Sequence, residues 1–159
     1  MKATAKTTIL IATHAVCIAL GFAGGIYTLP LLIAPPGPSA TELQAASATA
    51  QYRGVFRRDL AGSDALHWGE GEITLDAKAI TLTGRLAPGP DYKLYLSPQF
   101  VETEADFKKL KSSMVLVGDV RTFDGFFVPM AAGTDLTQFN TVVVWCESFE
   151  EFISAAQYR

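Results

Sequence analysis

Residues 70–86, EGEITLDAKAITLTGRL, decide the fold class of this chain. Apolar side chains alternate with threonines on both sides of a central break, as in Ile73, Thr74 and Leu75 before it and Ile80, Thr81 and Leu82 after it. An alternation with period two is typical of a β-strand that buries one face and exposes the other. Asp76-Ala77-Lys78 separates the two runs, so the segment predicts a β-hairpin.

Short β-rich runs with turn residues between them continue from Gln51 to the end of the chain. They lie at Tyr52–Arg58, Tyr92–Ser97, Val115–Val120, Gly125–Val128 and Phe139–Trp145. The run Thr141–Trp145 (TVVVW) has no alternation, so we expect a central strand covered on both faces. Thr103 and Asp106 form the N-cap signature of one short helix. Seven to eight short strands with one short helix predict an all-β, β-sandwich-like domain over residues 51–159.

An apolar segment precedes this domain. Residues 8–33, TILIATHAVCIALGFAGGIYTLPLLI, contain no Asp, Glu, Lys or Arg, and about 20 such residues suffice to cross a bilayer as a helix. Lys2 and Lys6 lie before the segment, in residues 1–7, and no Lys or Arg follows it until Arg53. The positive-inside rule therefore predicts a single-pass protein with a cytoplasmic N-terminus and an extracytoplasmic C-terminal domain, periplasmic in a Gram-negative bacterium.

A cleaved signal peptide is the alternative, because Gly21-Phe22-Ala23 resembles a cleavage site. The apolar run continues well beyond it, which favours an uncleaved anchor. Gly21 and Gly25 form a small-residue face on which two such helices could form a homodimer. Residues 34–50 are rich in Pro and Ala, and Ser39 with Glu42 fits a capping box, so we expect a stalk there that is a short helix or a frayed one.

The composition excludes some classes of partner. The formal net charge is −3 and no basic cluster stands out, which argues against nucleic acid as a partner. No nucleophile–base pattern, phosphate loop or dinucleotide motif is found, so the sequence names no catalytic constellation.

Cys146 is the residue of most chemical interest. It follows Trp145 at the end of the most hydrophobic of the predicted strands, and the other cysteine, Cys17, lies in the predicted membrane segment. An unpaired cysteine in an oxidising compartment has three explanations: a buried inert thiol, a redox thiol or intermolecular disulfide, or a ligand of a metal or haem. His67 is the only histidine of the domain, so one Cys and one His fall short of the ligand sets of copper or zinc sites.

Four segments of the domain resemble the DM-thirteen domain, an electron-transfer domain found beside DOMON modules in animals and alone in many bacterial proteins. They are Gly54-x-Phe56, His67-x-x-x-Gly71, Gly89-Pro90-Asp91-x-x-Leu94-Tyr95-Leu96-Ser97 and Val142-Val-Val-Trp145-Cys146-x-x-Phe149. The last two are the more specific, and the resemblance covers roughly residues 52–158. It implies an all-β domain in which Cys146 serves redox chemistry, as a bare thiol or through a prosthetic group such as haem.

The chain departs from the family pattern in two places. Ile153 stands where the family usually has glycine, and the common pair of histidines is reduced to His67 followed by Trp68. We therefore expect a membrane-tethered electron-transfer component centred on Cys146, with His67 as a weaker cofactor ligand, no metal site, and a separate membrane or periplasmic redox partner. The alternative is a non-catalytic binding or scaffold module in which Cys146 is a buried core residue.

Overall fold

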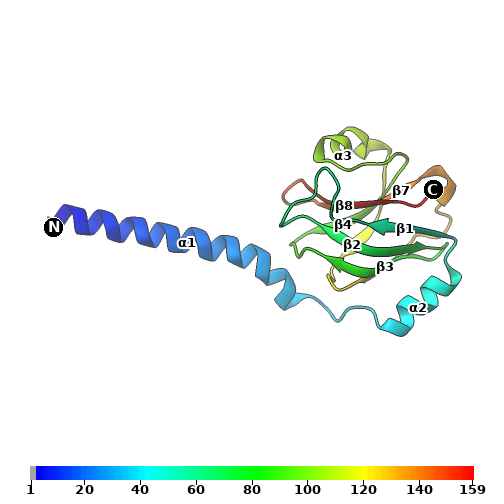
Figure 1. Ribbon diagram of the computed structural model, residues 1–159, viewed down its shortest axis with the longest axis horizontal. Helices are drawn as coiled ribbons and strands as arrows, with labels where there is room; N and C mark the ends of the chain where they lie inside the picture. The colour runs from blue at the N-terminus through cyan, green and yellow to red at the C-terminus, as the bar shows by residue number, and fades with distance from the viewer. Residues whose placement is uncertain (1–2) are drawn as a thin grey trace.

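The computed structural model describes residues 3–159 and has the predicted all-β, sandwich-like domain behind one long apolar helix (Figure 1). Two helices, α1 (Ala3–Ile33) and α2 (Ala40–Thr49), precede the strands, and α3 (Glu104–Leu110) lies between β4 and β5. The strands are β1 (Tyr52–Phe56), β2 (Gly69–Leu75), β3 (Ala79–Leu86), β4 (Tyr92–Ser97), β5 (Val115–Val120), β6 (Phe126–Pro129), β7 (Thr141–Cys146) and β8 (Glu151–Gln157). Short 3₁₀ turns cover Lys111–Ser113 and Leu136–Gln138.

Two four-stranded antiparallel sheets form the sandwich. Their strand orders are β1-β2-β3-β6 and β5-β4-β7-β8. The hairpin predicted over residues 70–86 is formed by β2 and β3, with Ile73 opposite Leu82 and Thr74 opposite Thr81. The sheets also approach each other at their edges, where β1 lies beside β8 and β5 beside β6.

Strand β7 is the central strand that the sequence predicts. All of its side chains are buried, and it pairs with β4 on one side and β8 on the other. Strand β8 was not among the runs predicted from the sequence. Its residues are buried from Phe152 to Ala156, so it shows no alternation, and alanine has a low preference for strands.

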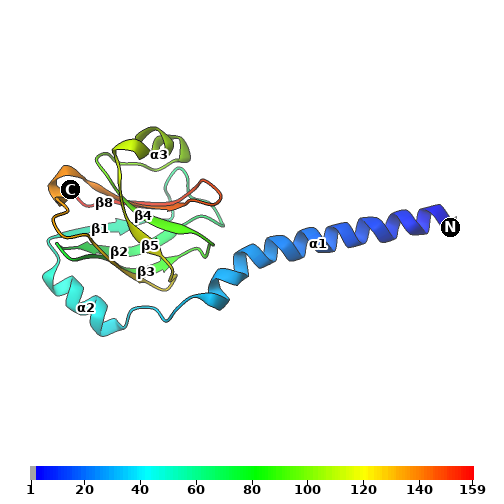
Figure 2. The ribbon, with the colours of Figure 1, turned by 180° about the vertical axis from the view of Figure 1, so that it is seen from behind.

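The domain has two hydrophobic cores, one on each face of the second sheet. The larger lies between the two sheets and includes Phe56, Ile73, Leu82, Leu94 and Val144. The smaller lies on the outer face of the second sheet, under α3, and includes Tyr95, Phe107, Val143, Trp145 and Phe152. Figure 2 shows α3 above the second sheet, with the first sheet below it.

The outer face of the β2–β3 hairpin differs from the prediction at one end. Glu72 and Thr83 are exposed as expected, but Thr74 and Thr81 are buried and their hydroxyl oxygens lie 2.6 Å apart in a hydrogen bond. Helix α2 lies against β2 and β3, with Thr49 donating a hydrogen bond to Asp76 at 3.1 Å. Its N-terminus has the predicted capping box, because Ser39 N donates to Glu42 Oε2 and Glu42 N donates to Ser39 Oγ.

Helix α1 extends away from the domain, and only its last turns touch it (Figure 1). Thr4–Ile33 is a candidate membrane span by its length and composition. Its side chains are exposed along most of the helix, whereas Ile26 and Tyr27 are partly covered and Pro30 is buried. The domain therefore contacts α1 near the end that leads into the rest of the chain.

Gly54 allows β1 to approach the second sheet closely. A Cβ atom at this position would lie 2.9 Å from the carbonyl oxygen of Gln157 in β8 and 3.2 Å from the Ile73 side chain.

We expect Gly54→Ala to lower the free energy of unfolding by about 1–3 kcal/mol, because backbone would have to move apart in a packed core. Thermal unfolding of the full chain measures this. Val55→Ala, at the exposed neighbour, is the control and should change stability far less. Equal effects of the two substitutions would contradict the close approach.

Candidate functional site

Cys146 lies at the end of β7, directly opposite Tyr92 of β4. Its side chain points into the core between the sheets and is 3% exposed. Burial raises the pKa of the Cys146 thiol, and hydrogen bonds to the backbone of Phe149 and Asp91 only partly offset this effect. The thiol is therefore protonated at neutral pH, which is the less reactive form of a cysteine.

Trp145, the preceding residue, points to the opposite face of the sheet. Its ring stacks on Phe107 of α3, with ring centroids 4.0 Å apart and an angle of 8° between the planes. Adjacent residues of a strand alternate between faces, so Trp145 fixes α3 to the outside of the sheet while Cys146 faces inward. Trp145 thus packs against α3, whereas Cys146 belongs to the core between the sheets.

His67 lies on the loop between β1 and β2 and is held by Asp64. The backbone amides of Leu66 and His67 both donate to Asp64 Oδ1 at 2.7 Å, and His67 Nδ1 donates to Asp64 Oδ2 at 3.1 Å. The partner of the His67 ring is thus the carboxylate of Asp64. This leaves Nε2 as the nitrogen available to a ligand, an arrangement common for metal-binding histidines.

One pocket contains both Cys146 and His67 in its wall. Its volume is about 490 Å³, and it lies at the end of the domain that contacts α1. The other lining residues are mostly apolar: Ala23, Ile26 and Tyr27 from α1, Leu66, Pro88, Gly89, Pro90, Tyr92, Phe149 and Ile153, together with Glu151. The structure thus brings together the two residues that the sequence singled out for cofactor binding.

Gly89 has a packing role in the same wall. A Cβ atom at this position would lie 2.4 Å from the ring and hydroxyl of Tyr92. The absence of a side chain at Gly89 therefore lets the Pro88–Pro90 turn close over Tyr92, next to Cys146.

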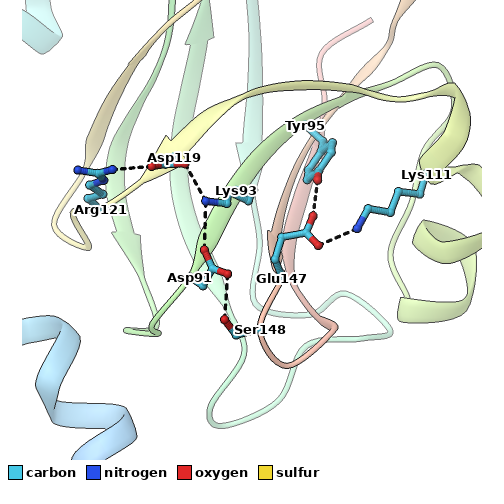
Figure 3. A network of polar contacts seen from close by, with 8 residues as sticks. All are labelled: Asp91, Lys93, Tyr95, Lys111, Asp119, Arg121, Glu147 and Ser148. Carbon is cyan, nitrogen blue, oxygen red and sulfur yellow. Dashed lines mark hydrogen bonds and ion pairs between the residues drawn. The ribbon is translucent and has the colours of Figure 1, made fainter.

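Two polar clusters fix the turn that follows Cys146 (Figure 3). In the first, Lys93 donates to Asp91 at 3.1 Å and to Asp119 at 2.8 Å, and Arg121 donates to Asp119 at 2.7 Å. Ser148 donates to the second oxygen of Asp91 at 2.9 Å. These contacts connect the turn after β7 to β4 and β5.

The second cluster is centred on Glu147. The hydroxyl of Tyr95 and the ammonium group of Lys111 each donate to one oxygen of its carboxylate, with Lys111 at 2.7 Å. Burial acts to raise the pKa of Glu147, but the hydrogen bonds from Lys111 and Tyr95 outweigh it and lower that pKa. Glu147 is therefore an ionised structural acid that holds the turn in place.

The acidic residues near the first loops have basic partners of their own. Asp59 pairs with Arg57, Glu70 with Arg58 and Glu72 with Arg53. The Arg58 guanidinium also lies over the Trp68 ring, 3.3 Å from its centroid. Within residues 3–159, no group of three His, Cys, Asp or Glu side chains is placed to hold a metal ion.

The comparison with protein families agrees with this arrangement of motifs. A family model described as Electron transfer DM13 matches residues 60–158. The chain belongs to this family. No curated protein and no solved structure matches the chain. Within the DM13 domain, the two most specific motifs form neighbouring strands: Gly89–Ser97 leads into and forms β4, and Val142–Phe149 forms β7 and the turn after it.

Sequence reasoning did not find the pocket itself. Gly89 and Pro90 were singled out only as part of a family motif, and nothing in that motif indicates that they line a pocket with Cys146. Tyr27 and Leu66 gave no signal beyond their apolar surroundings, and Phe149 appeared only as a member of a family motif. The Lys93 cluster depends on residues far apart in the sequence. Lys93 and Asp91 lie on opposite sides of Tyr92, and this spacing of opposite charges was the one sequence signal that could have suggested the pair.

We expect Cys146 to react slowly with a water-soluble thiol reagent. In a Cys17→Ser full chain, which leaves one thiol, modification at pH 7 should be at least about tenfold slower in the folded than in the denatured protein, because the thiol is buried and its pKa is raised. The rate in the folded protein should still be rising at pH values where the denatured thiol has levelled off. Equal rates at pH 7 would contradict the burial of the thiol.

The Lys93 cluster should make stability depend on pH in the acid range. Hydrogen bonds from Lys93 and Arg121 lower the pKa of Asp119, and those from Ser148 and Lys93 outweigh burial and lower the pKa of Asp91. The folding stability that Asp119 and Asp91 contribute is therefore fully present above their unfolded pKa of about 3.9. It is lost as the pH falls through their lower pKa values in the folded protein.

Lys93→Met should destabilise the full chain by about 1 kcal/mol at pH 7, since these groups are partly exposed and solvent weakens the pairs. The difference from the natural protein should shrink below pH 4. Lys109→Met, at an exposed position of α3, is the control and should have little effect at either pH. A Lys93→Met effect that stays constant with pH would contradict the ion-pair origin.

Proposed function

We propose that this protein is a membrane-tethered electron-transfer module, and that its redox-active region is the pocket lined by Cys146 and His67. The observation that carries the proposal is that the two most specific DM13 motifs and the loop of His67 converge on a single apolar pocket. Residues 8–33 are the proposed anchor, with the domain on the extracytoplasmic side.

The burial of Cys146 favours a bound redox group over a bare thiol. A reactive cysteine needs its thiolate form, and burial disfavours that form here. Cys17 lies on α1 and both cysteines are free, so the chain itself offers Cys146 no disulfide partner. A pocket of about 490 Å³ beside the thiol is in the size range of small-molecule and cofactor sites.

The residues of the pocket suit a prosthetic group whose metal already has most of its ligands. They suit a bare metal ion less well. A bare ion takes several protein ligands, and the described residues offer no group of three. Haem needs only one or two axial ligands from protein. His67 would supply Nε2, Asp64 would keep that imidazole oriented, and the apolar wall around Cys146 would exclude water. The haem would supply one-electron chemistry when bound.

The test uses the full chain purified from membranes in mild detergent. We expect an absorption band that changes reversibly on reduction, or one that appears on titration with haemin. His67→Ala and Cys146→Ser should shift or abolish this band. The chain contains a matched control for each, because His14→Ala and Cys17→Ser change the same residue types within α1, away from the pocket, and should leave the band unchanged.

A second function has one observation in its favour. Cys146 belongs to the core between the sheets, as it would in a binding or scaffold module without redox activity. No reversible band, no haemin binding and a thiol that reacts only after denaturation would together overturn the redox proposal in favour of this one.

A further inference from the structure

The opening of the Cys146 pocket is bordered by two large apolar side chains on separate loops. Leu66, between β1 and β2, is 56% exposed, and Phe149, between β7 and β8, is 51% exposed. Both also line the pocket. Burial of such side chains favours folding, so two of them exposed at one opening indicate a contact that the domain alone does not provide.

Helix α1 forms the wall on the same side. Ala23, Ile26 and Tyr27 line the pocket and all belong to the candidate membrane span Thr4–Ile33. This span has 30 residues, so at about 1.5 Å per residue it is longer than the roughly 30 Å of hydrocarbon in a bilayer. About 20 helical residues cross the hydrocarbon layer of a bilayer. If Lys6 lies at the cytoplasmic edge of that layer, Tyr27 lies at the outer interface, where tyrosine is favoured.

The depth of Tyr27 sets the position of the loops. Because the pocket is shared by Tyr27, Leu66 and Phe149, the two loops lie at the level of the outer headgroups or just below it. Figure 1 shows that this is the end of the domain from which α1 leaves, whereas the C-terminus lies at the opposite end.

The charges around the opening do not favour an electrostatic attraction to anionic lipid. Arg58, whose guanidinium lies over the ring of Trp68 next to His67, pairs with Glu70. Glu151 contributes a carboxylate to the pocket lining itself. Contact with a bilayer would therefore depend on the apolar side chains.

We propose that this end of the domain is a membrane-docking surface, with Leu66 and Phe149 inserted into the outer leaflet beside Tyr27. The partner is the phospholipid bilayer, and the pocket beside Cys146 opens onto its acyl chains instead of onto water. A molecule that reaches Cys146 and His67 then comes from the lipid phase. The inference rests on the membrane tether of the proposed function but not on the identity of a redox group.

The experiment measures the depth of single tryptophans in the full chain, reconstituted in phosphatidylcholine vesicles with bromine atoms on the acyl chains. All variants carry Trp68→Phe, and Trp145 remains as a buried, constant signal. Phe149→Trp and, separately, Leu66→Trp report the two loops. Val115→Trp is the matched control, because Val115 is also apolar and 41% exposed but pairs with Leu96 at the other end of β4. Phe22→Trp reports the anchor.

We expect emission from Phe149→Trp and Leu66→Trp to fall about twofold with bromines near the headgroups, since docked side chains reach the acyl boundary. Val115→Trp should be unaffected, and the loop signals should not change with salt or with added anionic lipid.

Quenching of Phe22→Trp without quenching of either loop would overturn docking while leaving the tether intact. An unquenched Phe22→Trp would overturn the tether itself. Loop signals that change with protein density rather than with bromine would show contact between copies of the chain, and this too would overturn the proposal.

Discussion

The antiparallel pairing of β4 with β7 is the constraint on which the rest of the domain depends. These are the two central strands of the second sheet, and their register places Tyr92 opposite Cys146. The pairing brings the Gly89-Pro90 turn against the end of β7, and it lets Asp91 hold Ser148 in the turn beyond. A shift of one residue in this register would turn Cys146 from the inner to the outer face of the sheet. The pocket therefore exists only in this one alignment.

Because side chains of β7 alternate between the two faces of the sheet, the residue that packs against α3 and the residue that lines the pocket lie on opposite faces. Trp145 packs under α3 on the outside of the sheet, and Cys146 faces the core and the pocket on the inside. Helix α3 can therefore be held by a large stacked aromatic pair without filling the pocket. The thiol, in turn, sits where the surrounding apolar side chains keep it protonated. In the proposed function, this environment protects the sulfur from solvent oxidants and leaves the pocket as the place where a redox group is held.

Local patterns in the sequence predicted most of the strands. The β2–β3 hairpin follows from its alternation, and the bounds predicted for β4 and β5 are those of the structure. Strand β8 was missed because it is buried on both faces and contains two alanines. Its apolar residues therefore do not alternate with polar ones, and its alanines have a low preference for strands. The exposed face predicted for Thr74 and Thr81 was wrong at that end of the hairpin, since the packing of α2 there is a long-range contact.

The candidate site was predicted residue by residue but not as an arrangement. Cys146 and His67 were singled out by their chemistry and by the family motifs. That they share a pocket depends on the path of the loop between β1 and β2, which local patterns do not specify. The strand order could not be predicted from the sequence either, because it is set by pairings between segments that lie far apart in the chain.

The segment between α1 and α2 restricts how the domain can be oriented. Pro30 is buried, Ala34 packs against the core between the sheets, and a Cβ atom at Gly37 would lie 3.8 Å from the carbonyl oxygen of Asp124. Covered positions at Pro30 and Ala34 therefore alternate with the exposed residues 31–33 and 35–37. The prolines at positions 35, 36 and 38 limit the backbone freedom of this segment. A flexible linker would let the domain turn any face toward a membrane. This one keeps the pocket end beside α1, so the direction in which the pocket opens follows from the direction of the helix.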